Sequence, residues 1–181
     1  MAEDIRQEMV ALLPRLRRFA YSLSGSMDEA DDLVQAACER ALARLRQYEP
    51  GTQLASWMFR LIQTIWIDRM RYEGRRRKVS GDGVMETIAF DARIHEQAEA
   101  RGLLEIVRRE VSRLSEDQRS VLALVVVEGM SYQQAADTLG VKIGTIMSRL
   151  ARARLKLAAA IDAREAGNPY RKETRNEATS R

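Results

Sequence analysis

Apolar residues recur at helical spacing along most of the chain. Residues 4–23 and 26–45 each carry apolar positions three and four apart, separated by polar ones, which predicts two amphipathic helices. Pro14 predicts a break or kink in the first of them. A third helix is predicted over 54–73, and helical periodicity resumes at about residue 95 and continues to residue 162. The pattern predicts an all-α protein.

Serine residues mark three of the predicted helix starts. Each is followed three residues later by Glu or Gln, the spacing of a capping box, in which both side chains bond backbone N–H groups at the helix start. A glycine at position 140 is a natural end for the helix before it. The predicted boxes are Ser26 with Glu29, Ser115 with Gln118, and Ser131 with Gln134.

Composition excludes several classes of protein. The chain of 181 residues has 30 basic and 26 acidic residues, one cysteine (Cys38) and one histidine (His95). A single thiol excludes an internal disulfide framework and a multi-thiolate zinc site. No apolar run reaches the roughly 18–20 residues that span a bilayer, and the polar start "MAEDIRQE" is unlike a signal peptide. We therefore expect a cytoplasmic protein with no metal, no cofactor and no membrane span.

The periodicity also predicts the domain organisation. We expect two small helical bundles, at residues 1–75 and 98–165, joined by a flexible linker at 76–97, whose sequence lacks sustained periodicity. Residues 166–181 form a polar tail, which we expect to be frayed.

Residues 131–154, "SYQQAADTLGVKIGTIMSRLARAR", have the organisation of a helix-turn-helix. On a helical wheel Thr145, Arg149, Arg152 and Lys156 fall within about 60° of one another, and the apolar face is centred about 100° away. Arginine can donate two hydrogen bonds to guanine, so this face is a candidate DNA reader; a merely solvated basic face is the alternative. The candidate contacts are Lys142, Thr145, Ser148, Arg149, Arg152 and Lys156.

Residues 114–157, "LSEDQRSVLALVVVEGMSYQQAADTLGVKIGTIMSRLARARLKL", closely resemble region 4 of sigma-70-type transcription initiation factors of the extracytoplasmic-function group (group IV). The resemblance implies a helix-turn-helix that reads the −35 promoter element and contacts the flap of the RNA polymerase β subunit. Met147 departs from the family pattern, because the family often has a cation there.

The segment "EADDLVQAACERAL" (29–42) resembles sigma region 2.2, which holds the clamp helices of the polymerase β′ subunit. Its polar, largely acidic strip suits a basic or polar partner helix. An ordinary amphipathic helix is the alternative, and a metal pair at Asp31 and Asp32 lacks a second carboxylate cluster. The candidate polymerase contacts are Asp31, Asp32, Leu33, Gln35 and Glu39.

Residues 55–78 resemble sigma regions 2.3 and 2.4, which capture a flipped base of the −10 element and start strand separation. Trp57, Phe59 and Trp66 could stack on bases or lie in the core, and we expect Trp57 to be core. The basic run after Gly74 is a phosphate footprint or a solubilising charge. The family usually has Asn at the position of Thr64. The candidate −10 contacts are Tyr48, Arg60, Thr64, Asp68, Arg69, Arg71, Arg75 and Arg76.

Together these resemblances imply an alternative sigma factor, which is not an enzyme itself. It would bind core RNA polymerase and promoter DNA in a stress or envelope response, under the control of an anti-sigma factor that could hold it at the membrane. Two alternatives remain: a sigma-like decoy that sequesters an anti-sigma factor, and a helix-turn-helix regulator with a sensory domain. The helical pattern of residues 1–75 argues against a receiver domain.

Overall fold

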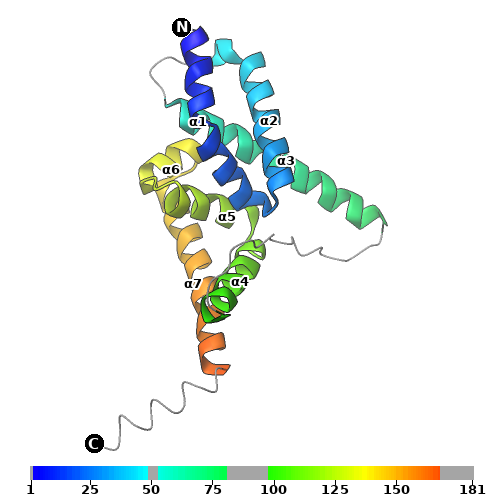
Figure 1. Ribbon diagram of the computed structural model, residues 1–181, viewed down its shortest axis with the longest axis vertical. Helices are drawn as coiled ribbons and strands as arrows, with labels where there is room; N and C mark the ends of the chain where they lie inside the picture. Colours follow the sequence, from blue (N-terminus) through cyan, green and yellow to red (C-terminus); the bar gives the residue numbers. More distant parts are fainter. Residues whose placement is uncertain (1, 49–52, 81–97, 168–181) are drawn as a thin grey trace, which may run out of the picture.

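The structure is a computed structural model that describes residues 2–48, 53–80 and 98–167. These residues form seven α-helices with no strand among them (Figure 1), so the all-α prediction is confirmed. The elements in chain order are α1 (Ala2–Ser24), α2 (Met27–Ala43), a 3₁₀ turn η1 (Leu45–Gln47), α3 (Leu54–Ser80), α4 (Ala98–Ser112), α5 (Glu116–Leu122), a π-helical segment η2 (Ala123–Val127), α6 (Tyr132–Leu139) and α7 (Ile143–Gly167).

Helices α1, α2 and α3 pack on one another around large apolar side chains. The rings of Phe19 and Phe59 meet edge to face with their centroids 4.9 Å apart, a geometry that the ring quadrupoles favour. Trp66 is only 1% exposed and fills the same core. The buried positions of α1 and α3 recur at intervals of three and four residues, so the apolar pattern identified both helices correctly.

Helix α1 runs through Pro14 as one helix, so of the predicted break or kink only the break is wrong. A proline has no N–H for the carbonyl four residues earlier, which here belongs to Val10. Both Pro14 and Val10 are exposed, so water can bond that carbonyl. Met9 and Leu16 are buried and hold the two halves of the helix against the bundle.

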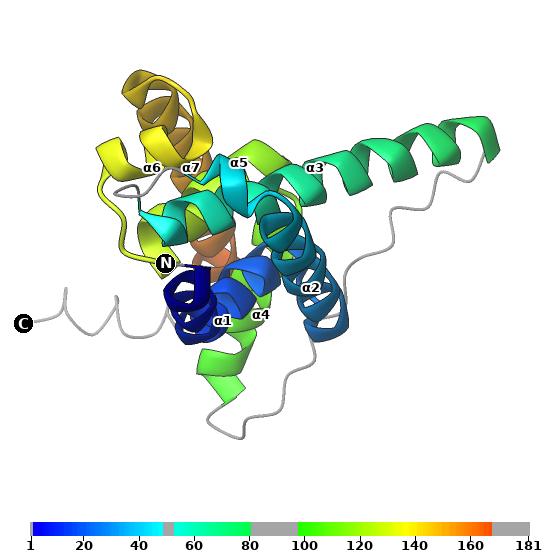
Figure 2. The same ribbon diagram turned by 90° about the horizontal axis from the view of Figure 1, so that it is seen from above.

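Helix α3 is longer than the sequence predicted. It continues past Gly74 to Ser80, so residues 76–80, which were expected in the linker, extend the helix. Figure 2 shows that this end of α3 projects away from the rest of the molecule. Residues 81–97, the rest of the predicted linker, and residues 168–181, most of the predicted tail, lie outside the described residues.

Serine caps fix the short helices of the C-terminal part. Ser115 and Ser131 form complete capping boxes with Gln118 and Gln134, as predicted. Helix α6 ends at Gly140, which has a φ of 65°, a left-handed conformation that favours glycine.

At the start of α2 the predicted box is only half formed. Ser26 Oγ accepts from the Glu29 N–H at 3.4 Å, but the Ser26 N–H donates to Ser24 Oγ at 3.3 Å and not to Glu29. The Glu29 carboxylate is therefore free to face α3. Burial raises the pKa of Glu29, and Glu73 and Asp32 raise it further, while Arg69 opposes the shift.

The valine-rich run after α5 is not an ordinary α-helix. Residues Ala123–Val127 form a π-helical segment, in which the Glu128 N–H donates to the Ala123 carbonyl at 3.0 Å. Such segments interrupt α-helices and are frequent at functional sites. Here η2 packs against α1, α5 also contacts α1, and α6 contacts α3. The buried apolar residues of both parts consequently form one continuous core.

None of the helices in residues 2–48, 53–80 and 98–167 has the length and apolar character needed to cross a membrane. In the same ranges, no three His, Cys, Asp or Glu side chains come together as a group that could hold a metal ion.

Candidate nucleic-acid and partner interfaces

The predicted DNA-reading helix, α7, has one apolar and one polar face. Ile146, Leu150 and Ala153 are buried against the neighbouring helices. The polar candidates lie on a neighbouring face about 100° away: Thr145 and Arg149 are half-buried, and Lys142, Ser148, Arg152 and Lys156 are exposed. The structure therefore presents these six residues at one surface.

Two of these side chains are tied to the start of α5. Arg149 Nη2 donates to Asp117 Oδ2 at 2.5 Å, and Lys156 Nζ donates to Gln118 Oε1 at 3.4 Å. The Ser148 hydroxyl donates to the Thr145 carbonyl of its own helix at 3.1 Å. The first of these contacts fixes the direction of the Arg149 guanidinium, whereas the Arg152 side chain forms no hydrogen bond or ion pair within the described residues.

The acidic strip on α2 is mostly exposed. Asp31, Asp32, Gln35 and Glu39 all lie at the surface. Arg17 of α1 donates two hydrogen bonds, of 2.6 and 2.8 Å, to Asp31. Both side chains are exposed, so a partner can still reach the Asp31 carboxylate. Gln35 donates to Glu39 at 3.1 Å, one helical turn away. The strip is available to a partner.

Leu33 differs from the other polymerase-contact candidates. Its side chain is fully buried in the core between the N-terminal helices. Only its polar neighbours reach the surface in this structure, and the polymerase contact of Leu33 stays a prediction. Its role is to hold α2 in place.

The aromatic residues of α3 are not arranged for base stacking. Phe59 and Trp66 are buried in the core, so a base cannot reach their rings. Trp57 is half-buried at the edge of that core and packs against Tyr48, with the ring centroids 5.4 Å apart. The family resemblance implies a base pocket in the loop from Tyr48 to Gln53. Tyr48, the partner of Trp57, is its first residue, and residues 49–52 lie outside the described residues.

The polar candidates on α3 lie along its surface. The Thr64 hydroxyl donates to the Arg60 carbonyl one turn earlier at 2.8 Å, so it is bonded within its own helix. Arg69 is half-buried, and the side chain of Arg76 lies outside the described part of the structure. The remaining candidates, Arg60, Asp68, Arg71 and Arg75, are exposed.

Arg60 lies beside the turn of the helix-turn-helix. A Cβ atom added at Gly140 would lie 3.0 Å from Arg60 Nη2. Arg60, a candidate contact for the −10 element, therefore lies beside the turn that precedes α7, the candidate reader of the −35 element. The sequence did not indicate this proximity.

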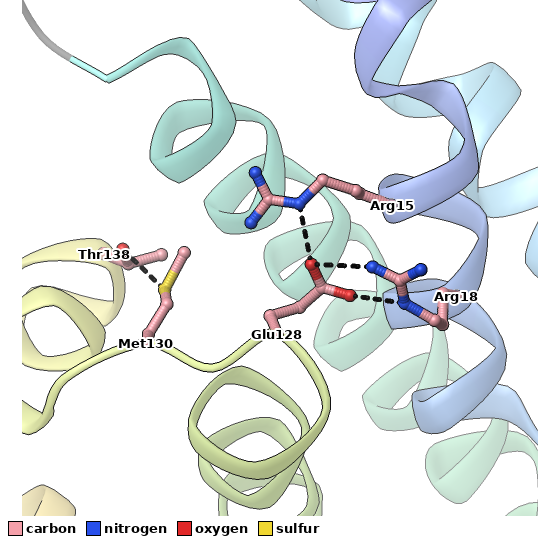
Figure 3. Close-up of polar contacts among 5 residues, drawn as sticks. All are labelled: Arg15, Arg18, Glu128, Met130 and Thr138. Carbon is pink, nitrogen blue, oxygen red and sulfur yellow. Dashed lines mark hydrogen bonds and ion pairs between the residues drawn. The ribbon is translucent and has the colours of Figure 1, made fainter.

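Two further polar contacts join the halves of the molecule, and the sequence analysis missed both. Figure 3 shows Arg15 and Arg18 of α1 pointing at Glu128, which follows η2. Arg119 of α5 donates to the Leu23 carbonyl in the last turn of α1. Burial lowers the pKa of the Arg119 guanidinium, and Glu116 opposes this shift. The only sequence signal was a lone acid, Glu128, between an apolar run and a glycine.

Comparison with known proteins identifies both halves of the chain. Residues 104–157 match the family described as Sigma-70, region 4, and residues 9–63 match the Sigma2 domain of PhyR. The chain is 39% identical to the ECF RNA polymerase sigma factor EcfG of Rhodopseudomonas palustris over 160 residues, covering 88% of this chain and 86% of that protein.

Solved structures agree with this result. The sigma factor RpoE of Bartonella quintana, in complex with the anti-sigma factor NepR, is 34% identical, with a TM-score of 0.74 over 88% of this chain and 98% of that one. The anti-anti-sigma factor PhyR of the same organism, also in complex with NepR, is 19% identical with a TM-score of 0.56 over 86% of this chain and 50% of that one, and shares the fold.

The fold and the two family matches define a sigma-70 type transcription initiation factor. The chain belongs to the extracytoplasmic-function (ECF) sigma factors of this family. Its function is accordingly that of an alternative sigma factor with a DNA-binding helix-turn-helix.

Proposed function

We propose that the two halves of this sigma factor divide the work of promoter recognition. Residues 1–75 would bind the β′ clamp helices of core RNA polymerase through α2 and recognise and melt the −10 element through α3. Residues 98–165 would read the −35 element through α7 and contact the β flap. Sigma factors are regulators, and the polymerase carries out the chemistry. The site of action would be the cytoplasm, at the nucleoid.

The polarity of α7 is the observation that carries this proposal. Its apolar face is buried, and Arg152 and Lys156 on the other face are exposed. Arginine can form two hydrogen bonds with a guanine edge, and lysine can neutralise phosphate charge. A helix with one buried apolar face and one exposed basic face can lie in the major groove of DNA while the neighbouring helices support its apolar face.

The surfaces of α2 and α3 support the other half of the proposal. Three carboxylates on α2 are exposed: Asp31, Asp32 and Glu39. Exposed charges of one sign steer a partner of opposite sign and set the register of binding. Along α3 the exposed Arg71 and Arg75 lie on the projecting end of the helix and suit a nucleic-acid backbone.

An anti-sigma factor is the second proposed partner. The similar RpoE of Bartonella quintana was solved in complex with the anti-sigma factor NepR. We expect a protein of that kind to bind this chain and keep it from polymerase. If the anti-sigma factor were itself membrane-bound, it would hold the complex there.

Transcription with purified core RNA polymerase tests the proposal. The protein is added to core enzyme and a genomic library, and the transcripts are sequenced, with a known sigma factor as the positive control. We expect transcripts that start downstream of one shared pair of sequence elements. Failure to obtain any specific transcript, while the control sigma factor is active, would refute the proposed function.

A sigma-like decoy is the second candidate. The observation in its favour is the match of residues 9–63 to the Sigma2 domain of PhyR, a protein described as an anti-anti-sigma factor. A decoy needs no DNA-reading face, but here α7 keeps exposed Arg152 and Lys156. The transcription assay separates the two functions, because a decoy would bind an anti-sigma factor and give no promoter-specific transcript.

A further inference from the structure

The contact between the two halves contains a buried acid bound by two arginines. Glu128 Oε2 lies 3.0 Å from Arg15 Nε, and Glu128 Oε1 lies 3.1 Å from Arg18 Nε. The Glu128 side chain is 0% exposed, whereas both arginines remain partly open to solvent. A buried carboxylate is stable only with partners of this kind. Arg15 and Arg18 of α1 can pair with Glu128 only while the two halves are packed together. We call these three residues the Glu128 latch (Figure 3).

The turn that carries Glu128 is held firmly in place. Met130 and Thr138 are buried behind it, and the Thr138 hydroxyl approaches the Met130 sulfur at 3.8 Å (Figure 3). The Met130 N–H donates to the Leu124 carbonyl at 3.0 Å. The position of the Glu128 carboxylate is therefore set by the C-terminal half, before it meets the arginines of α1.

Arg119 provides a second, independent tie. Its guanidinium is buried and donates to the Leu23 carbonyl at the end of α1 and, at 2.6 Å, to the Ser112 carbonyl at the end of α4. Carbonyls in the last turn of a helix lack partners within that helix and carry the negative end of its dipole. A cation bound there stabilises the junction of α1, α4 and α5.

The closed arrangement conflicts with simultaneous reading of two promoter elements. Arg60 on α3 and Gly140 before α7 are in contact. The −10 and −35 elements, about 25 base pairs apart by their names, are separated by roughly 85 Å along B-DNA at about 3.4 Å per base pair. Helix α3 packs on α6, the helix directly before α7, and elements packed this closely cannot lie on two sites so far apart.

We propose that the Glu128 latch holds the free sigma factor in a closed, promoter-incompetent state, which must open before both elements are bound. The inference rests on the proposed division of promoter recognition between α3 and α7. It adds a device within the chain itself that needs no bound partner. Partners that favour the closed state, and core polymerase with promoter DNA, which requires the open state, would then compete through this contact.

A distance measurement on the free protein tests the latch without polymerase or DNA. Spin labels are attached after Ala11→Cys on α1 and Val126→Cys in η2, two exposed positions within four residues of the latch on elements that pack together, in a Cys38→Ala background that removes the native thiol. The unaltered latch should give one short distance. Glu128→Gln should raise the ratio of long to short distances by about tenfold, because the amide lacks the charge that binds both arginines.

Glu110→Gln is the matched control. Glu110 forms a 2.7 Å ion pair with Arg113 within α4, so the same substitution there should leave the distances unchanged. Thermal unfolding of Glu128→Gln shows whether the variant remains folded. A folded Glu128→Gln protein with the distances of the parent would overturn the proposal.

Charge reversal keeps the test decisive if Glu128→Gln fails to fold. Arg15→Glu with Arg18→Glu should open the molecule, and the addition of Glu128→Arg should restore the short distance. An equally open triple variant would contradict the latch. In the complex with core polymerase and promoter, the labels should move apart, and persistence of the short distance there would also overturn it. Absence of transcription by the parent would instead count against the proposed function and leave the free-protein result standing.

Discussion

The N-terminal and C-terminal halves of this sigma factor are stabilised in different ways. Helices α1, α2 and α3 are 23, 17 and 27 residues long and bury large side chains such as Phe19 and Trp66. In the other half, α5 and α6 have only 7 and 8 residues, and small side chains such as Ala135 and Ala136 are buried. Helices this short are marginal alone, so the C-terminal half depends more on its caps.

This difference matches the work proposed for each half. The complete capping boxes at Ser115 and Ser131, together with the left-handed Gly140, fix where each short helix starts or stops. They thereby set the direction of α7, which must fit a groove. In the N-terminal half, the long packed helices provide a rigid frame for two separate surfaces, on α2 and α3.

The largest effect is expected from the tryptophans of α3. Trp66→Ala should lower the free energy of unfolding by about 3–5 kcal/mol, because it opens a cavity in the large-residue core. Trp57→Ala should cost clearly less, since Trp57 is half-buried and contacts Tyr48 at the edge of the core. Chemical denaturation measures both. Equal losses would show that the N-terminal core does not extend as we describe.

An intermediate effect is expected on the acidic strip of α2. Asp31→Ala with Asp32→Ala should weaken binding to core polymerase by about tenfold, because both charges are exposed and act at the rim of an interface. The measurement is competition for core enzyme against a second sigma factor. Asp28→Ala, also exposed and in the first turn of α2, is the control. Unchanged competition by the double variant would place the polymerase contact elsewhere.

The smallest effect concerns the capping partners and compares the two halves directly. Gln134→Ala should cost about 0.5–1 kcal/mol of stability, because the Gln134 side chain accepts from the Ser131 N–H at 2.8 Å. Glu29→Ala should cost less, since Ser24 bonds the corresponding N–H of Ser26. Thermal unfolding of both variants tests this difference. A larger loss for Glu29→Ala would contradict the account of the half-formed box.

Local features of the fold were predictable from the sequence. Apolar spacing identified the helices, and the boxes at Ser115 and Ser131 and the stop at Gly140 follow rules that involve only near neighbours. Tertiary packing was less predictable. From the sequence alone, Phe59 and Trp66 could either stack on DNA bases or lie in the core. The packing of α3 on α1 and α2 buries both, which decides for the core.

Contacts between residues far apart in the sequence could not be predicted. Glu128 lies more than 100 positions from both Arg15 and Arg18, and Arg149 meets Asp117 from another helix. Helical periodicity states which face is buried but not which face of a distant helix it meets. Similarly, Gly74 is unfavourable within a helix by about 1 kcal/mol relative to Ala, yet α3 continues past it to Ser80.

Promoter selection by variants of α7 tests the central claim most directly. A promoter library randomised at both elements is transcribed by core enzyme with each protein, and the transcripts are sequenced. Arg149→Ala with Arg152→Ala should abolish sequence preference at −35, because each lost base contact removes about 1–3 kcal/mol of discrimination between bases. Preference at −10 and binding to core enzyme should remain. Arg154→Ala, about 140° round the helix from Arg149, should change none of these. Unaltered −35 preference in the double variant would contradict the assignment of α7 as the reader.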